Sequence, residues 1–457
     1  MNFTRPSNAM ETRFSTYITL LAAHVGLGFL GIIYPPVIKY VLLLAIVYFL
    51  MMIIRTANSD NHALLGAAYI AGFEVFSRMT GGAFSYEFAK YMVIGFLGLG
   101  MFYRGFQRAS WPYLFYLLCL VPGILMAAIN LSFDAKIGNA LGFNLSGPVC
   151  LGISALYGYQ NPITQQRFKT LMELLIYPLV AIVTYVILYA PSLEEVITGT
   201  GSNFAASGGF GPNQVSTVIG LGMFLLFSRL FMVKDRLYNL VDLFLLAVFT
   251  YRGLATFSRG GMIAAILCMA LFLIYFLLKT DGLERMKWLV KTGVLSFLFL
   301  IIWSSVSLTT DGLLNKRYAN QDARGRDKAT LTTGRAQLAN IELEAFLQNP
   351  VFGVGVGKGK ELRAEEGLEA TASHNEISRL FAEHGSFGIL ALLILLIAPL
   401  VMRFTDRSNV YVYAFVAFWF LTINHSAMRI AMPAFIYGLA LLQIIPNEET
   451  SPEESWP

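Results

Sequence analysis

The sequence predicts an all-α protein that crosses a membrane many times. Of its 457 residues, 56% are hydrophobic and 13% are charged, and the mean hydropathy is +0.61. A water-soluble domain of this length has too little interior to bury so much apolar surface. Apolar runs of near-bilayer length, about 17–25 residues, recur from end to end. These features indicate a polytopic membrane protein with about 14 (12–14) transmembrane helices.

Fourteen apolar segments carry this prediction. They are 16–33, 37–54, 62–79, 88–105, 111–130, 145–160, 171–190, 212–230, 238–256, 260–279, 288–306, 386–403, 409–424 and 428–446. The segment 145–160 is short, and the run 238–279 is broken by SRGG. We therefore divide the chain into an N-terminal bundle (1–306), a long loop with short helices (307–385), C-terminal membrane helices (386–446) and a disordered acidic tail (447–457).

The placement of Lys and Arg predicts the orientation of the chain. If the segments alternate, one set of loops holds Arg5, Arg13, Arg55, Arg104, Arg108, Arg167, Lys169, Lys234, Arg236, Arg285, Lys287, Arg403 and Arg407. By the positive-inside rule, that side is the cytoplasm, so both termini are cytoplasmic and loop 307–385 faces outward. The N-terminal segment lacks a small-x-small cleavage motif and is expected to stay as the first helix.

The charge and the cysteine usage argue against nucleic-acid binding, disulfides and a metal site. The net charge of +5 belongs to short loops, as membrane topology requires, and does not indicate nucleic-acid binding. Cys119, Cys150 and Cys268 all lie inside apolar runs, so neither disulfides nor a metal site are expected. The outward loop also lacks a cluster of Asp and Glu suited to Mg²⁺, and no cofactor is expected.

Several cations fall on the outer side, where topology does not call for them. They are Arg78, Lys90, Arg252, Arg259, Arg335, Arg379 and Arg429. A cation near the hydrocarbon boundary is costly, and each one alone is explained by snorkelling to lipid phosphate or by local pairing. Glu74 and Arg78, at i and i+4, are expected to form such a structural pair. The set gathered on one face favours an anion site.

The segment ASHNEISRLFAEHG carries the candidate catalytic residue. Ser373-His374-Asn375-Glu376 fits a capping box and predicts a helix that begins at Ser373. His374 then lies in the first turn, where the helix dipole favours an anion and disfavours imidazolium. A neutral imidazole facing a bound anion is placed to act as a general base. The alternative is a capped helix whose histidine points to water. Asn375 and Arg379 share one helix face.

Three further motifs lie in the outward loops. In FSRGGM, Gly260-Gly261 permits a tight turn or close backbone approach, and the planar fork of Arg259 suits a phosphate. A helix from about Gly334 to Gln348 is expected to lie on the membrane surface, with Arg335 as a second phosphate contact. GVGVGKGK lacks the spacing of a phosphate-binding loop and is read as a turn. In GGFGPNQVST, Asn213 is an uncharged hydrogen-bonding group at the outer rim.

The order of GGFGPNQVST, FSRGGM, GRAQLANIELEAFLQNPVFGVGVGKG and SHNEISRLFAEHGSFGIL resembles the O-antigen ligase/polymerase (Wzy-type) superfamily. The likeness is specific from about residue 205 to 403. It implies a GT-C-like glycosyltransferase in the bacterial inner membrane with its active site facing the periplasm. His374 matches the proposed base of the family, and Arg259 and Arg335 match arginines proposed to hold pyrophosphate. His384 departs from the family pattern.

The resemblance implies that glycan moves from undecaprenyl pyrophosphate to an acceptor hydroxyl, such as a lipid A-core sugar or another glycan. Arginines can stabilise the pyrophosphate leaving group without a metal, and a single displacement inverts the anomeric carbon. The ligase, the polymerase and a protein oligosaccharyltransferase remain open alternatives. A lipid-linked oligosaccharide flippase is a more remote one, since carriers place ionisable groups near the midplane between repeated halves.

Overall fold

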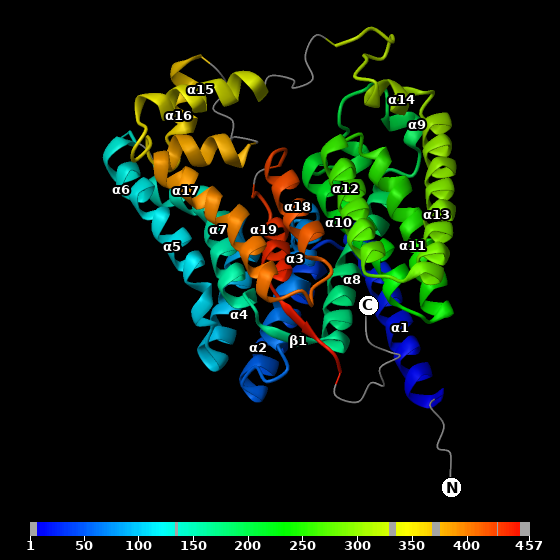
Figure 1. Ribbon diagram of the computed structural model, residues 1–457. Coiled ribbons are helices and arrows are strands. Elements are labelled where there is room, and N and C mark those ends of the chain that lie inside the picture. Colours follow the sequence, from blue (N-terminus) through cyan, green and yellow to red (C-terminus); the bar gives the residue numbers. More distant parts are fainter. Residues whose placement is uncertain (1–6, 133–135, 329–334, 368–374, 427, 448–457) are drawn as a thin grey trace.

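The computed structural model describes residues 7–132, 136–328, 335–367, 375–426 and 428–447. Long helices stand side by side in one bundle, and shorter helices cover one of its ends (Figure 1). The first eight helices are α1 (Ser7–Ile33), α2 (Pro36–Thr56), α3 (His62–Met79), α4 (Phe88–Arg104), α5 (Trp111–Cys119), α6 (Val121–Asn130), α7 (Ile137–Gly158) and α8 (Gln165–Tyr189).

The remaining helices complete the bundle and its cover. They are α9 (Leu193–Val196), α10 (Pro212–Met232), α11 (Arg236–Ala255), α12 (Arg259–Leu278), α13 (Gly282–Thr309), α14 (Leu313–Tyr318), α15 (Arg335–Gln348), α16 (Gly359–Glu365), α17 (Glu376–Thr405), α18 (Val412–Ile423) and α19 (Ala431–Ala440). Short 3-10 turns lie at Arg108–Ser110 and Ala205–Ser207.

The helices confirm a polytopic all-α membrane protein. Among the described residues, ten segments are long and apolar enough to cross a bilayer, and α18 and α19 are shorter apolar helices. Each of the fourteen expected segments overlaps a helix or a pair of helices, but α3 and α4 are not among the ten. The count of fourteen crossings therefore stays a prediction.

Several expected boundaries are wrong. α7 begins at Ile137, well before the expected residue 145, so this segment is not short. The last expected span ends early, because α19 stops at Ala440 and strand β2 (Gln443–Ile445) follows. β2 pairs in parallel with β1 (Pro162–Thr164), a small addition to an otherwise helical fold. The run 111–130 is divided into α5 and α6, with Pro122 at the start of the second helix.

Local sequence explains where key helices begin. The side chain of Asp235 accepts hydrogen bonds from the N–H groups of Leu237 and Tyr238 and so caps α11. Pro212 occupies the first turn of α10, where its missing N–H costs nothing. α10 is buried on every side and packs against α8, α11 and α12. It forms the centre of the right-hand part of the bundle in Figure 1.

The segment 349–357, which contains most of the turn expected at GVGVGKGK (353–360), packs against a break in α17. Gly353, Gly355 and Gly357 all have positive φ, which confirms the turn. Inside α17, Gly385 has φ 58° and ψ −137°, and a Cβ there would lie 2.6 Å from the Val351 carbonyl oxygen. The N–H of Ser386 then bonds to the Pro350 carbonyl oxygen at 2.8 Å. Gly385 separates a short outer helix from the long apolar part of α17.

The helix expected at about 334–348 is observed as α15 (Arg335–Gln348), and it packs on another helix. α15 packs along α17, where Ala345 is buried and Phe346 lies 6.1 Å from Phe381 between ring centroids. Leu343 and Leu347 stay exposed on the other side. Part of its apolar side is therefore buried against α17, and its position at the membrane surface stays a prediction.

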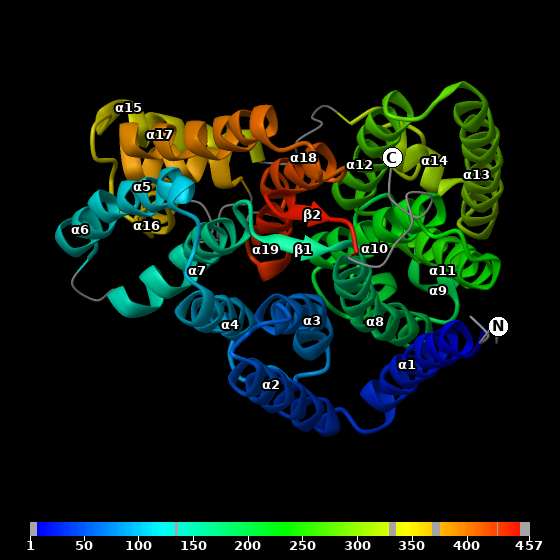
Figure 2. The same cartoon turned by 60° about the horizontal axis from the view of Figure 1, so that its bottom comes forward.

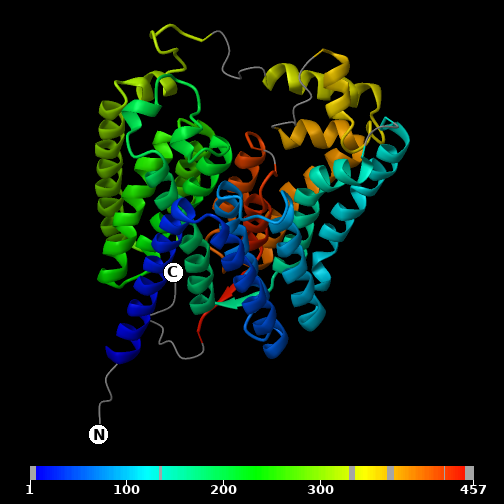
Figure 3. The same ribbon diagram turned by 180° about the vertical axis from the view of Figure 1, so that it is seen from behind.

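The two ends of the bundle carry different segments. α14, α15 and α16 lie at the top of Figure 1, and β1, β2 and the start of α1 lie at the bottom. The view from behind shows the same arrangement (Figure 3). α18 and α19 stand inside the bundle, where α18 packs on α12 and α19 packs on α7. We call the end with α14–α16 the loop end, and the end with β1 and β2 the strand end.

Candidate functional site

The FSRGG motif lies at the loop end, where α10 and α12 come into close backbone contact. A Cβ on Gly261 would lie 2.3 Å from the carbonyl carbon of Ser216, so only glycine fits there. This confirms the close approach predicted for the glycine pair. Before it, Phe257 is buried with φ 55°, a left-handed conformation that a phenylalanine rarely adopts. The backbone that presents Arg259 is therefore fixed and strained.

Hydroxyl and amide groups connect the two helices beside Arg259. Ser258 Oγ donates to Asn213 Oδ1 at 2.8 Å, and Ser216 Oγ donates to Ser258 Oγ at 2.9 Å. Thr217 Oγ1 donates to the Asn213 carbonyl oxygen at 2.7 Å. Asn213 is half-buried at the start of α10 and takes part in the hydrogen bonds that join α10 to the start of α12.

Arg259 lies in a group of three cations with Arg317 and Lys328. Arg259 Nη1 donates to the Arg317 carbonyl oxygen at 3.2 Å, and Arg317 Nε donates to the Phe257 carbonyl oxygen at 2.9 Å. Lys328 Nζ donates to Thr200 Oγ1 at 2.9 Å. Partial burial, together with the charges of Arg317 and Arg259, lowers the pKa of Lys328. A bound anion would relieve this mutual repulsion.

Sequence reasoning missed Arg317 and Lys328. The pair Lys316-Arg317 in α14 was an available signal, because adjacent cations are unusual in a loop that the positive-inside rule predicts to face outward. Their distance from FSRGGM along the chain concealed the contact with Phe257 and Arg259.

The segment 424–430 between α18 and α19 connects the two halves of the loop end. His425 Nε2 lies 3.1 Å from Thr217 Oγ1, and a Cβ on Gly260 would lie 2.5 Å from the His425 ring. On the other side, the N–H of Met428 donates to Glu376 Oε2 at 3.4 Å. Figure 1 shows α18 between α12 and α17. This segment thus contacts both Gly260, next to Arg259, and Glu376 at the start of α17.

A second group of cations gathers around Arg429. Arg429 interacts electrostatically with the cations Arg78 and Arg379 and with Tyr86 and Glu376. The backbone of the same segment is held by Arg78, whose Nη1 donates to the Arg429 carbonyl oxygen at 3.1 Å. The N–H of Ala431 donates to Glu74 Oε2 at 2.6 Å.

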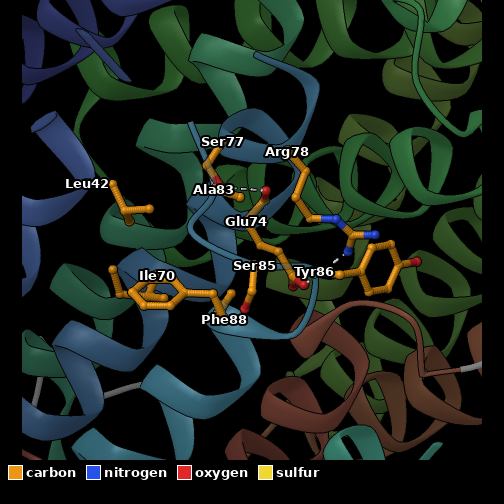
Figure 4. Close-up of a pocket in the computed structure, with 10 residues that line it drawn as sticks. Leu42, Ile70, Glu74, Ser77, Arg78, Ala83, Ser85, Tyr86 and Phe88 are labelled. Atoms are coloured by element: carbon orange, nitrogen blue, oxygen red, sulfur yellow. Dashed lines mark hydrogen bonds and ion pairs between the residues drawn. The ribbon is translucent and has the colours of Figure 1, made fainter. Parts of the chain in front are cut away.

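Arg78 is committed to neighbours within the protein. Its Nη1 lies 3.2 Å from Glu74 Oε1, which confirms the predicted intrahelical ion pair. The guanidinium also lies 3.7 Å from the centroid of the Tyr86 ring, a cation–π contact (Figure 4). The cavity lined by these side chains has a volume of about 10 Å³, enough for a single water. A glycan or pyrophosphate does not fit there.

Arg379 and Lys90 are likewise paired with carboxylates. Arg379 bonds to Glu376, to Glu383 at 3.1 Å and to Asn144 Oδ1 at 3.0 Å. Lys90 is fully buried and bonds to Glu87 and to Ser146 Oγ at 3.1 Å. A further ion pair, Arg363 with Glu342 at 3.0 Å, joins α16 to α15. These carboxylates leave little of the positive charge of the paired cations for a ligand.

The carboxylates around Arg379 were not anticipated from sequence. Glu342, Glu376 and Glu383 come from α15 and α17 and surround guanidinium groups. In the exposed turn DARGRD, Asp322 pairs with Arg326 at 2.7 Å. The N–H of Arg326 holds the pKa of Asp322 below its usual value.

The predicted start of the catalytic helix is wrong. Asn375 is the cap of α17, and its Oδ1 accepts from the N–H groups of Ile377 at 2.9 Å and Ser378 at 3.4 Å. The first turn therefore begins at Glu376 instead of Ser373, and His374 precedes the cap. His374 itself lies outside the described residues. Arg335 begins α15, and its side chain is also outside the described part.

His384, which sequence analysis left without a role, is a packing residue. It is 2% exposed and has a backbone hydrogen bond with Leu120, between α5 and α6. A Cβ on Gly123 would lie 2.3 Å from His384 Nδ1, so the ring fills the space that this glycine leaves. His384 joins the end of the outer half of α17 to the junction of α5 and α6.

Comparison with known families gives one match. A sequence model of the O-antigen ligase family matches residues 243–393, which include FSRGGM, α15 and the start of α17. No curated protein matches the chain. The match confirms the resemblance drawn from the order of motifs, and the matched range contains Arg259, Arg317, Lys328, Arg335 and His374.

Proposed function

We propose, from the membership of residues 243–393 in the O-antigen ligase family, that this multi-pass membrane enzyme transfers a glycan from undecaprenyl pyrophosphate to an acceptor hydroxyl. The loop end would face the periplasm, and the acceptor would be a sugar of lipid A core. Growth of a glycan chain by a polymerase of the same superfamily is the alternative.

One observation supports the proposal most directly. The segment between α18 and α19 contacts Gly260 through His425 and Glu376 through the N–H of Met428, so it connects the FSRGG motif with the start of α17. These motifs are more than 100 residues apart in the sequence. In the proposal, Arg259 binds the pyrophosphate, assisted by Arg317, Lys328 and Arg335.

The chemistry needs few other groups. The departing pyrophosphate gains negative charge in the transition state, and preorganised cations stabilise it. A sugar hydroxyl is a poor nucleophile and needs a base within hydrogen-bond reach, the role proposed for His374. Asn375 caps α17, and in the proposal the N-terminal end of this helix, with its favourable dipole, lies beside the anionic substrate. Such a displacement inverts the configuration of the transferred sugar.

Replacing His374 tests the proposed base. We expect His374→Ala to reduce transfer by about 10²–10⁴-fold, the usual contribution of a general base, without changing protein level or thermal stability. Purified protein in liposomes is given undecaprenyl-pyrophosphate glycan and, separately, lipid A core or a second glycan. Glu366→Ala, an exposed change in the same loop, is the control. Unchanged turnover in His374→Ala would remove this residue from catalysis.

Product length in the same assay distinguishes ligase from polymerase. A ligase attaches one glycan to each acceptor, whereas a polymerase yields a ladder of repeat units. Transfer to lipid A core without a ladder supports the ligase assignment. A ladder with no lipid A-core product would replace it by the polymerase.

Arg259→Lys tests whether phosphate binding needs a planar fork or only a charge. Lysine keeps the charge but cannot make a bidentate contact, so turnover is expected to fall strongly. Arg324→Lys is the matched control, because Arg324 is exposed at the same end of the molecule. Normal turnover in Arg259→Lys, measured at saturating donor, would mean that charge alone suffices.

A further inference from the structure

His425 is a buried histidine between α18 and α19 to which the proposed transfer assigns no role. It is 9% exposed, and α18, which leads to it, packs along α12 (Figure 2). A polar ring removed from water needs hydrogen-bond partners inside the protein. Two of the contacts of His425 lead to the residues on either side of Arg259.

The first contact is with Gly260, the residue after Arg259. A Cβ on Gly260 would lie 2.5 Å from Cγ and 2.6 Å from Cδ2 of the His425 ring. The ring therefore packs directly on the glycine backbone and occupies the space in which a side chain would begin. A smaller side chain at 425 would leave a void beside the start of α12, into which this backbone would relax.

The second contact leads through hydrogen bonds to Ser258, the residue before Arg259. His425 Nε2 lies 3.1 Å from Thr217 Oγ1, which donates to the Asn213 carbonyl oxygen at 2.7 Å. The Asn213 side chain in turn accepts a hydrogen bond from Ser258 Oγ at 2.8 Å. Thr217 and Ser258 are buried, so water is not available to replace these bonds without separation of α10 from α12.

The His425 ring is held at both of its nitrogens. Nδ1 lies 3.1 Å from the Leu421 carbonyl oxygen, which can only accept, so Nδ1 carries a hydrogen and Nε2 is the nitrogen that faces Thr217. The ring cannot turn away from Gly260 without loss of both contacts. Its orientation is therefore tied to the last turn of α18 and to the first turns of α10.

The backbone that leads into Arg259 needs such support. Phe257 has φ 55°, a left-handed conformation that persists in a residue with a large side chain only where the surroundings impose it. The contacts of His425 lie within three residues of this point, on Gly260 and, by way of Thr217, on Ser258. Their loss would let the strained backbone relax and would move the guanidinium of Arg259.

We propose that His425 is a positioning residue for Arg259, which it holds through Gly260 and through the hydrogen bonds of Thr217. The inference rests on the proposed function, in which Arg259 binds the pyrophosphate. A planar guanidinium that binds two phosphate oxygens at once depends on its exact placement, so a small backbone shift weakens binding of the donor. Binding of the acceptor does not depend on this placement.

A double-mutant cycle with purified full-length protein tests the proposal. Dissociation constants for undecaprenyl pyrophosphate are measured for the wild type, His425→Phe, Arg259→Ala and the double variant. If His425 acts through Arg259, the two effects are not additive. We expect His425→Phe alone to weaken binding about 10-fold, and to have no further effect in the Arg259→Ala protein. In the transfer assay, His425→Phe should raise KM for the donor and leave KM for the acceptor unchanged.

A second variant and a matched control accompany the cycle. Thr217→Val removes the hydroxyl at nearly constant volume and should weaken binding to a similar extent, so the cycle is repeated with it in case the phenylalanine ring disturbs folding. His24→Phe is the control, because His24 Nδ1 lies 2.7 Å from the Leu20 carbonyl oxygen and Nε2 lies 3.1 Å from Tyr69 Oη. This buried histidine has the same kind of partners elsewhere in the bundle, and its replacement should leave donor affinity unchanged. Thermal midpoints of all variants identify any loss that reflects unfolding.

Three outcomes would overturn the proposal. Additive effects of His425→Phe and Arg259→Ala would show that His425 acts on the fold or on another group, and an equal rise of both KM values would show the same. Unchanged donor affinity in His425→Phe and Thr217→Val would remove the positioning role and leave the proposed function intact. Failure of the wild type to bind undecaprenyl pyrophosphate would instead reject the proposed function, and the inference with it.

Discussion

The cations at the loop end differ in what they contact, and this difference decides their roles. Arg78, Lys90 and Arg379 each pair with a buried or nearly buried carboxylate, which cancels most of their field. Arg259 and Lys328 bond to neutral oxygens, so their charge remains effective for an anion. The sequence predicted that cations gather on one face, but it did not predict which of them are neutralised.

The sequence did not show which cations are neutralised, because some of their partners are distant in the chain. Glu74 could be paired with Arg78 because both lie on one helix, four positions apart. Asn144, which bonds to Arg379 at 3.0 Å, comes from α7, and no local pattern links the two. His425 was overlooked for the same reason, since its contact with Thr217 joins α18 to α10.

Removal of Arg379 should destabilise the protein even without substrate. Arg379→Gln leaves Glu376 and Glu383 buried without their cation, which costs about 3–5 kcal/mol for a buried pair. The midpoint of thermal unfolding in detergent should fall accordingly, and Arg379→Gln/Glu383→Gln should recover part of the loss. Arg326→Gln breaks an exposed pair and should change stability by less than about 1 kcal/mol. Equal effects of the two single variants would contradict a structural role for Arg379.

At the scale of helices, the sequence predicted which helices exist and in what order better than it predicted where each helix begins and ends. Apolar runs and glycine or proline breaks located each long helix, and the residue before Pro350 ended α15 near the expected position. The start of α17 was misplaced because Ser373 and Asn375 are both good caps, and only tertiary contacts select between them. The break at Gly385 depends on the turn 349–357, which occupies the space a continuous helix would need.

The α10–α12 contact gives a prediction at this scale. Gly261→Ala places a methyl group against the backbone of Ser216 and should force the two helices apart, with a loss of about 1–3 kcal/mol or more. Gly293→Ala, in α13, has nothing within 4 Å of the new Cβ and should be neutral or slightly stabilising. Thermal unfolding of both variants in one detergent measures the difference. Similar midpoints would show that α10 and α12 can separate at little cost.

At the scale of the whole molecule, the two ends of the bundle carry different segments, and which end faces the cytoplasm stays a prediction. The long loop helices α14–α16 lie at one end, and the strands with the start of α1 lie at the other (Figure 1). Along the chain, loops rich in Lys and Arg alternate with loops that contain few of them. The positive-inside rule predicts an orientation from this alternation. The parallel pairing of β1 with β2 depends on the folded bundle, since the strands are about 280 residues apart, and no local signal predicts it.

Cysteine labelling in intact cells tests both the orientation and the number of crossings. Cys119, Cys150 and Cys268 are buried, so a membrane-impermeant maleimide should report on introduced cysteines. We expect Arg324→Cys and Glu366→Cys to react in intact cells, and Arg108→Cys and Arg407→Cys to react only after permeabilisation. Reaction of the first two only after permeabilisation would place the loop end in the cytoplasm and remove the proposed periplasmic site.

The broken helix pair α5–α6 is the point where the crossing count is most easily tested. Pro122 lies at the junction, and a break of this kind either leaves one crossing intact or turns the chain back. α5 and α6 run on in the same direction in Figure 1, so Asn139→Cys, just beyond them, should react in intact cells while Arg108→Cys does not. If both positions react under the same condition, the pair does not cross, every later segment changes side, and fourteen crossings cannot be correct.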